Sequence, residues 1–221
     1  MAAASELDGP TLGPASGRPP TALVVLLHGL GADGHDLIGL AHEWAPLLPD
    51  AAFLSPHAPF PCDMAPFGRQ WFSLQERTAS AILAGIQVAA PILDAWLDSQ
   101  LARLGLTDDR LALVGFSQGT MMALYTAPRR PRACAAVVGY SGALFATEPL
   151  ETAPSKPPVL LVHGDADNVV PVQASVNAGA ALAAAGFDVR TEIRPGLAHG
   201  IDPEGLQMGG EFLARHLGGD P

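Results

Sequence analysis

The segment Gly-Phe-Ser-Gln-Gly at residues 115–119 places a serine where nucleophilic chemistry is feasible. An apolar run of strand length, residues 111–114, leads into it, and a helix-compatible segment follows. A serine hydroxyl attacks a carbonyl only when a base removes its proton, so it must stand at a sharp turn that base and substrate can both reach. Glycines leave room for such a turn because they have no Cβ. This context predicts a nucleophile elbow at Ser117 rather than a glycine-flanked turn without chemistry.

The helix after Ser117 and an earlier glycine-rich loop indicate how an oxyanion would be stabilised. The first N–H groups of a helix have no partner inside it and lie at the positive end of its dipole, which makes the backbone N–H of Gln118 one candidate donor. A second donor is expected from the loop 28–34, which follows an aliphatic run at 22–27. Within this loop the backbone N–H of Leu30 is the candidate.

The same loop raises a rival interpretation. Gly29, Gly31 and Gly34 match the dinucleotide-binding pattern G-x-G-x-x-G between a strand and a helix. That reading also needs an acidic residue at the end of the next strand to hold the ribose. The next strand, residues 51–54, ends in Ser-Pro-His-Ala-Pro, and Asp50 stands at its start. A dinucleotide-dependent oxidoreductase is therefore disfavoured, and no cofactor is expected.

A base and an orienting carboxylate should follow Ser117 in the order acid, then histidine, each in a loop after a later strand. Of the seven histidines, only His199 stands in a loop after the last predicted strand. Asp165 and Asp167 share the loop after the strand at 159–162, and their spacing does not choose between them. His199 would take the Ser117 proton, the aspartate would orient the imidazole, and water would release an acyl-enzyme.

The elements that must position these residues alternate between strand and helix. The run 22–27 is aliphatic throughout, as is typical of a strand buried on both faces of a parallel sheet. The alternation predicts an α/β fold with a mostly parallel sheet, whose functional groups gather at the carboxyl ends of the strands. Strands are predicted at 22–27, 51–54, 111–115, 133–139, 159–162 and 189–193, with helices at 36–48, 79–104, from 118, at 172–185 and up to 217.

Two segments break this alternation. Residues 1–20 are rich in proline and glycine and are predicted to form a flexible arm, with room for a short edge strand, before a single domain at 21–221. Residues 56–78 are irregular and aromatic, which is more typical of a functional loop than of a disordered one. These aromatic side chains would either form a wall of an acyl pocket or pack the loop onto the core.

Charge and cysteine content limit the partners and the compartment. The formal net charge is −10 and Lys156 is the only lysine, which argues against nucleic acid and anionic lipid as partners. Cys62 and Cys134 cannot form a disulfide framework, so a reducing cytoplasm is expected. The first residues lack the positive start and long apolar core of a secretory signal, apolar runs are strand-sized, and no stable membrane insertion is expected. No metal-ligand spacing is evident, and apolar loops beside a cleft would permit a homodimer.

Four blocks, at residues 28–34, 115–119, 163–171 and 196–199, resemble in content and order the signature blocks of the phospholipase/carboxylesterase family of α/β-hydrolases, relatives of acyl-protein thioesterases. The resemblance extends from about residue 22 to residue 217. It implies the α/β-hydrolase fold, with helices on both faces of the central sheet. It also selects Asp167, which precedes Val-Val-Pro, as the catalytic acid, and it places Trp71 and Phe72 near the substrate cleft.

These observations together predict a cofactor-independent serine hydrolase that cleaves carboxylic esters of short or medium acyl chain through an acyl-enzyme on Ser117. Acyl-protein thioesterase and lysophospholipase activities are the near alternatives, because one triad serves all of them. An inactive binding module of the same fold is disfavoured by the intact set of Ser117, Asp167 and His199.

Overall fold

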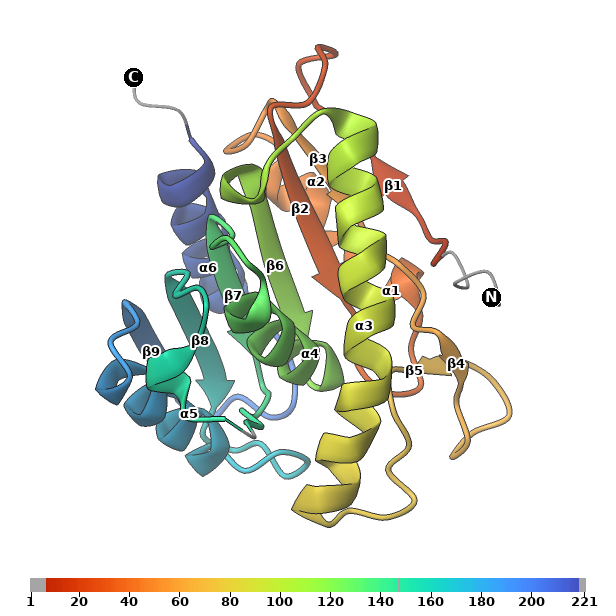
Figure 1. Ribbon diagram of the computed structural model, residues 1–221, viewed down its shortest axis with the longest axis vertical. Helices are drawn as coiled ribbons and strands as arrows, with labels where there is room; N and C mark the ends of the chain where they lie inside the picture. The colour runs from red at the N-terminus through yellow and green to blue at the C-terminus, as the bar shows by residue number, and fades with distance from the viewer. Residues whose placement is uncertain (1–6, 147, 219–221) are drawn as a thin grey trace.

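A computed structural model describes residues 7–146 and 148–218, and its centre is a seven-stranded sheet (Figure 1). The strand order is β1-β3-β2-β6-β7-β8-β9, with β1 antiparallel to β3 and the other neighbours parallel. The bounds are β1 Thr11–Leu12, β2 Ala22–Leu27, β3 Ala51–Leu54, β6 Leu111–Phe116, β7 Ala136–Tyr140, β8 Val159–Gly164 and β9 Val189–Arg194. The mostly parallel sheet predicted from the sequence is confirmed.

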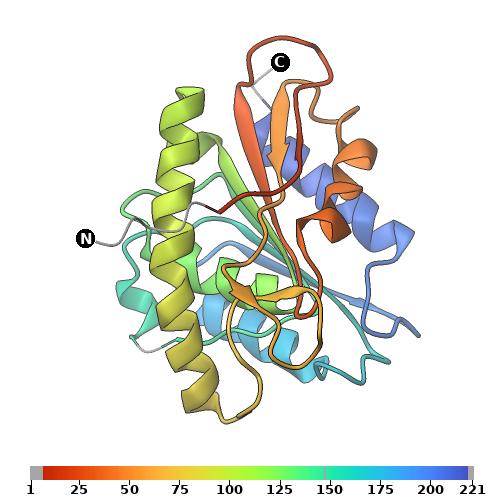
Figure 2. The ribbon, with the colours of Figure 1, turned by 90° about the vertical axis from the view of Figure 1, so that its right-hand side faces the viewer.

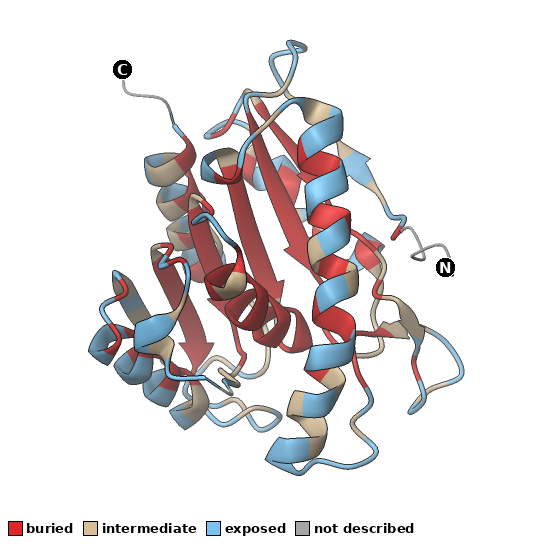
Figure 3. Cartoon of the chain, viewed as in Figure 1, coloured by how far each residue is buried: buried red, intermediate tan, exposed pale blue. Residues whose placement is uncertain are grey.

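Helices cover both faces of this sheet, as the views in Figures 1 and 2 show. On one face, α3 (Ala79–Leu104), α4 (Gln118–Thr126) and α5 (Gln173–Ala184) pack on alternate strand residues such as Leu23 and Val25. On the other face, α1 (Gly34–Ile38), α2 (Leu40–Trp44) and α6 (Pro203–Leu217) pack on Val24 and Leu26. Because both faces are covered, the central strands are buried along nearly their whole length (Figure 3).

The register of the sheet brings the loops of interest together. Leu27 pairs with Gly115, so β2 and β6 end side by side and their following loops meet at one edge. The ends of β8 and β9 reach the same edge, where Gly164 pairs with Arg194. All the candidate chemistry therefore lies at the carboxyl ends of parallel strands, as expected for an open α/β sheet.

Of two predicted helices, one is divided in the structure and the other is present as predicted. The helix expected at 36–48 is divided into α1 and α2 at Gly39. The helix predicted at 79–104 is present with these bounds as α3 and keeps Pro91 inside it. By length and composition α3 could cross a membrane, with a mean hydropathy of 1.5 over its most apolar window, but its buried side packs against the sheet.

The two segments that break the alternation both contain short strands. The described part of the N-terminal segment carries the short edge strand β1, and Ser55 N donates to Pro10 O at 3.0 Å. Residues 1–6 of the predicted arm lie outside the described residues. Within 56–78, two short strands, β4 (Phe60–Pro61) and β5 (Arg69–Gln70), form a small antiparallel hairpin that the sequence did not indicate.

Candidate active site

Ser117 occupies the sharp turn that the glycine pattern predicts. It lies between β6 and α4 with φ 55° and ψ −115°. Residues other than glycine rarely adopt this backbone conformation, which is typical of strained functional turns. A Cβ on Gly115 would lie 2.3 Å from Thr120 N, and one on Gly119 would lie 1.8 Å from Leu27 O. Because neither approach is sterically allowed, both positions require glycine.

His199 and Asp167 lie next to this turn and contact each other. The His199 Nδ1 atom is 2.7 Å from Asp167 Oδ2, and the ring of His199 packs on that of Phe116 with centroids 4.8 Å apart. The Asp167 side chain is fully buried. Ser117 and His199 line the same cavity, whose volume is about 350 Å³. The fold thus brings together three residues that are far apart in the chain, in the order serine, aspartate, histidine.

The Asp167 carboxylate is surrounded by donors. Its Oδ1 accepts hydrogen bonds from Val169 N at 2.8 Å and Val170 N at 2.9 Å, while Oδ2 faces His199. Burial favours the neutral carboxyl, but the hydrogen bonds from the imidazole and the two backbone N–H groups outweigh it, so the pKa of Asp167 lies below its ordinary value. A carboxylate held in this way can orient the histidine and stabilise its protonated form.

The other aspartate of this loop has a different role. Asp165 is exposed, and its Oδ1 accepts a hydrogen bond from Gly196 N at 2.6 Å. That contact joins the loop after β8 to the loop that carries His199. The spacing alone left Asp165 and Asp167 open; in the structure it is Asp167 that contacts the imidazole, in agreement with the family resemblance.

His163 is a buried neighbour of Asp167 that the sequence reasoning did not single out. Its Nε2 lies 2.8 Å from Val170 O and 3.1 Å from Asp167 Oδ2, and its Nδ1 lies 2.7 Å from Ser175 Oγ. Because Nε2 faces two oxygen acceptors, it carries a proton. This histidine therefore holds the acid loop in place, and no local sequence pattern marks that role.

The two residues whose backbone N–H groups are proposed to bind an oxyanion, Leu30 and Gln118, line the same cavity as Ser117. Leu30 reaches it from the loop after β2, and Gln118 reaches it from the first turn of α4. Neither N–H group donates a turn or loop hydrogen bond among the described residues. Both are therefore available to a developing negative charge, and the positive end of α4 points the same way.

The wall of the cavity comes from residues that the sequence did not indicate. Besides Leu30, Ala32 and Phe116, its apolar residues are Leu74, Ile82, Met121, Val169 and Val170, and its charged residues are Asp36 and Arg77. No local pattern marks these positions, because an apolar residue in a loop or a helix looks the same in a wall as in a core.

Trp71 and Phe72 support this cavity from behind instead of lining it. Their exposed fractions are 0% and 2%, and neither is among the described residues that line the cavity. Trp71 Nε1 donates to His28 O at 3.0 Å, which joins the segment 56–78 to the loop with Leu30. Of the other aromatic residues in this segment, Phe60 packs on the core and Phe67 is 75% exposed, so packing, the alternative left open, accounts for most of these side chains.

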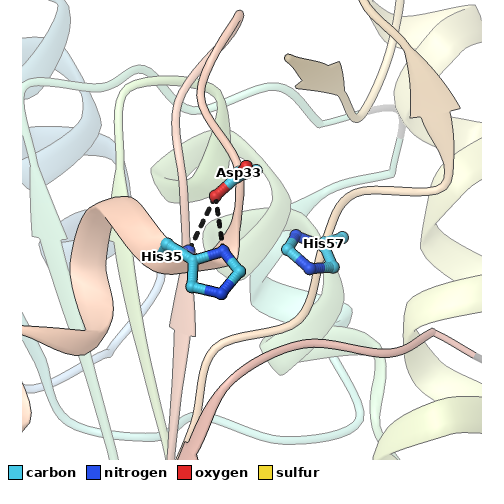
Figure 4. Close-up of side chains that lie close together, drawn as sticks. All are labelled: Asp33, His35 and His57. Atoms are coloured by element: carbon cyan, nitrogen blue, oxygen red, sulfur yellow. Dashed lines mark hydrogen bonds and ion pairs between the residues drawn. The ribbon is translucent and has the colours of Figure 1, made fainter.

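A group of potential metal ligands lies at the end of the loop 28–34. Asp33, His35 and His57 each place one ligand atom within 4.8 Å of the others (Figure 4). Asp33 Oδ1 caps α1 by accepting from His35 N at 2.8 Å, and His57 Nδ1 accepts from Gly34 N at 3.0 Å. A neutral imidazole has one nitrogen lone pair, and here Gly34 N–H occupies it. These contacts organise the start of α1.

The chain is similar to known esterases and thioesterases along most of its length. Residues 14–217 match the family described as phospholipase/carboxylesterase. Esterase YpfH of Escherichia coli is 32% identical over 200 residues, which cover 90% of this chain and 83% of that protein. Acyl-protein thioesterase 1 of Neurospora crassa is 28% identical over 226 residues, covering 94% and 91%.

The crystal structure of esterase PE8 superimposes with a TM-score of 0.91 at 46% identity, and the match covers 96% of this chain and 100% of that one. The α/β-hydrolase fold implied by the resemblance is therefore confirmed. Given a family match over most of its length, an esterase relative above 30% identity and an esterase structure of nearly the same shape, the chain belongs to the phospholipase/carboxylesterase family.

Proposed function

We propose that Ser117, His199 and Asp167 form a catalytic triad that hydrolyses carboxylic esters of short or medium acyl chain. The observation that carries this proposal is the 2.7 Å contact between His199 Nδ1 and the buried Asp167 carboxylate at the cavity that Ser117 lines. With Nδ1 engaged by the carboxylate, Nε2 is the nitrogen left to act on the serine hydroxyl.

The reaction proceeds in two halves. His199 Nε2 takes the proton of Ser117 Oγ as the oxygen attacks the acyl carbonyl, and the N–H groups of Leu30 and Gln118 bind the resulting oxyanion. Collapse of the tetrahedral intermediate breaks the ester bond, and His199 gives its proton to the departing alcohol. Water, deprotonated by the same nitrogen, then attacks the acyl-enzyme, which releases the acid and restores Ser117.

The cavity supports a substrate of limited size. Its volume of about 350 Å³ must hold both sides of the scissile bond, and most of its lining is apolar. This favours an ester with a short or medium chain. Thioesters and lysophospholipids are the alternatives, and the similarity to an acyl-protein thioesterase supports the first of them.

The compartment and the assembly are also part of the proposal. Cys62 and Cys134 are both buried and unpaired, which suits a reducing cytoplasm. A small-molecule ester, and neither nucleic acid nor a membrane, is the expected partner of a chain with net charge −10. Val169 at the cavity is 63% exposed, and apolar side chains of this kind beside a cleft would suit a homodimer.

The test is a p-nitrophenyl ester series from acetate to palmitate, with an acyl thioester beside it, on wild type and on Ser117→Ala. We expect a maximum at short or medium chains, labelling of the wild type by a fluorophosphonate, and loss of turnover by about ten-thousandfold in the variant. Wild-type protein that neither labels nor hydrolyses any of these substrates would refute the proposal. A clear preference for the thioester would replace it with the thioesterase alternative.

A further inference from the structure

The side chain of Gln118 has a role distinct from that of its backbone. Its Oε1 accepts a hydrogen bond from Trp71 N at 3.1 Å, and its Nε2 donates to Phe72 O at 2.8 Å. Only 1% of Gln118 is exposed, so both hydrogen bonds are buried. The backbone N–H is left for the cavity, while the side-chain amide clamps two consecutive residues from 46 and 47 positions earlier in the chain.

The clamped residues connect directly to the wall of the cavity. Phe72 packs so closely on α3 that a Cβ on Gly85 would lie 2.6 Å from Phe72 Cβ. Leu74, two residues further on, lines the cavity, and Ile82 lines it from the first turns of α3. The position of this wall relative to Ser117 therefore depends on where the segment 71–74 is held.

The same cluster reaches the loop with the second oxyanion donor. Trp71 Nε1 donates to His28 O, and His28 Nε2 accepts from Ala58 N at 3.0 Å while His28 Nδ1 lies 2.7 Å from Gly29 O. Burial lowers the pKa of His28, which keeps the ring neutral and its Nε2 able to accept. Gln118, Trp71 and His28 thus join the nucleophile turn, the pocket segment and the loop 28–34.

We propose that the Gln118 side chain is a positioning residue that sets the acyl-chain selectivity of the cavity by holding Trp71 and Phe72 at a fixed place beside Ser117. This inference rests on the proposed esterase function. It assigns a specificity role to the residue after the nucleophile, in addition to its backbone N–H. Without the amide, Trp71 N–H and Phe72 C=O would be buried without partners, and the segment would have to move to satisfy them.

The first test removes both contacts while keeping the length of the side chain. In Gln118→Met we expect the ratio of kcat/KM for p-nitrophenyl octanoate to that for the acetate to change by about fivefold or more, mainly through KM, because the wall moves. Gln87→Met on the exposed face of α3 is the matched control and should keep the wild-type ratio. The proposal would be overturned if Gln118→Met left the ratio of the two kcat/KM values unchanged. It would also be overturned if kcat/KM fell equally for every ester together with the Tm.

The second test uses Gln118→Glu, which keeps the acceptor for Trp71 N. A protonated Glu side chain can also donate to Phe72 O, whereas the ionised form cannot. We therefore expect the selectivity of this variant to approach that of wild type at low pH and to depart from it as pH rises. A selectivity that stays constant over the whole pH range would speak against the clamp, since a purely steric role has no such dependence.

A third measurement separates failure of the clamp from failure of the proposed function. Exchange of the Trp71 backbone amide, followed by NMR, reports the contact to Oε1 without any substrate. We expect Gln118→Met to accelerate this exchange by about tenfold while amides of β7 keep their wild-type rates. Unchanged Trp71 exchange would overturn the clamp even in an active esterase. If Trp71 exchanges faster in Gln118→Met but the wild type hydrolyses no ester, the contact to Gln118 is supported and only the proposed esterase function is refuted.

Discussion

The two sides of Ser117 are built by different kinds of interaction. On the side of His199, the buried carboxylate of Asp167 accepts hydrogen bonds from the imidazole and from two backbone N–H groups. All these residues lie in the loops that directly follow β8 and β9. On the side of the cavity wall, Trp71 and Phe72 are held by neutral hydrogen bonds between side-chain and backbone groups, to Gln118 and to His28 O. The contacts on the first side involve a charged carboxylate, whereas those that hold Trp71 and Phe72 are neutral.

This difference indicates that the two sides control different properties of the reaction. Charge-assisted hydrogen bonds are roughly twice as strong as neutral ones, so the base side is held rigidly and serves every substrate in the same way. The neutral side can shift without dismantling the triad, and a shift there changes the space offered to the acyl chain. We therefore expect mutations on the base side to lower turnover of all esters and mutations on the wall side to change which ester is preferred.

Among changes to the two sides of Ser117, the largest effect should come from Asp167→Asn. The amide cannot hold His199 in the tautomer that accepts the serine proton, so kcat/KM should fall by about a thousandfold or more on every ester of the series. Asp165→Asn is the matched control in the same loop, because an asparagine oxygen can still accept from Gly196 N. It should lose less than about tenfold. If Asp165→Asn lowers kcat/KM more than Asp167→Asn does, Asp167 is not the catalytic acid.

The next effect is expected from Gly85→Ala, which tests the wall from the side of α3. The new methyl group would lie 2.6 Å from Phe72 Cβ, so Phe72 must move, and the free energy of unfolding should fall by about 1–3 kcal/mol. Long esters should show a raised KM, while the kcat of the acetate changes less.

Gly39→Ala serves as the control for Gly85→Ala. Gly39 has helical dihedral angles, and nothing lies within 4 Å of its added Cβ. Alanine there should raise stability by about 0.5–1 kcal/mol in a urea titration and leave selectivity as it is. Equal stability changes in the two variants would contradict the close packing of Phe72 on α3.

A smaller effect should follow from Leu74→Ala. This change removes apolar volume from the lining without touching a hydrogen bond, so it should move the preferred ester toward longer chains by a few-fold in kcat/KM. Leu47→Ala, an exposed leucine outside the lining, is the control. A uniform loss of turnover in Leu74→Ala would mean that the wall also holds the triad, and the division between the two sides would not stand.

The smallest effect is expected from a chelator. In the proposed mechanism the nucleophile, the base and the oxyanion donors are all protein groups, so activity after dialysis against EDTA should agree with the untreated value within error. Variants His35→Ala and His57→Ala should respond to EDTA in the same way as wild type. A loss of activity that zinc restores would instead assign a metal to the group of Asp33, His35 and His57.

The sequence was sufficient for the features that depend on neighbours in the chain. Aliphatic runs predicted the buried parallel strands, and the glycines around Ser117 predicted its sharp turn, because both patterns express local steric and burial requirements. Chain order then singled out His199. The choice of Asp167 over Asp165 came from the family resemblance, and only the structure showed that Asp165 instead accepts a hydrogen bond from Gly196 N.

The tertiary structure decided which residues surround the cavity. Trp71 and Phe72 are buried behind the wall, Leu74 and Ile82 form part of it, and His163 braces the acid loop. None of these roles follows from a local pattern, because an aromatic, aliphatic or histidine side chain has the same sequence signature in a core and beside a substrate. Aliphatic runs and the order of the motifs can be read along the chain, whereas a cavity exists only where segments distant in the chain meet.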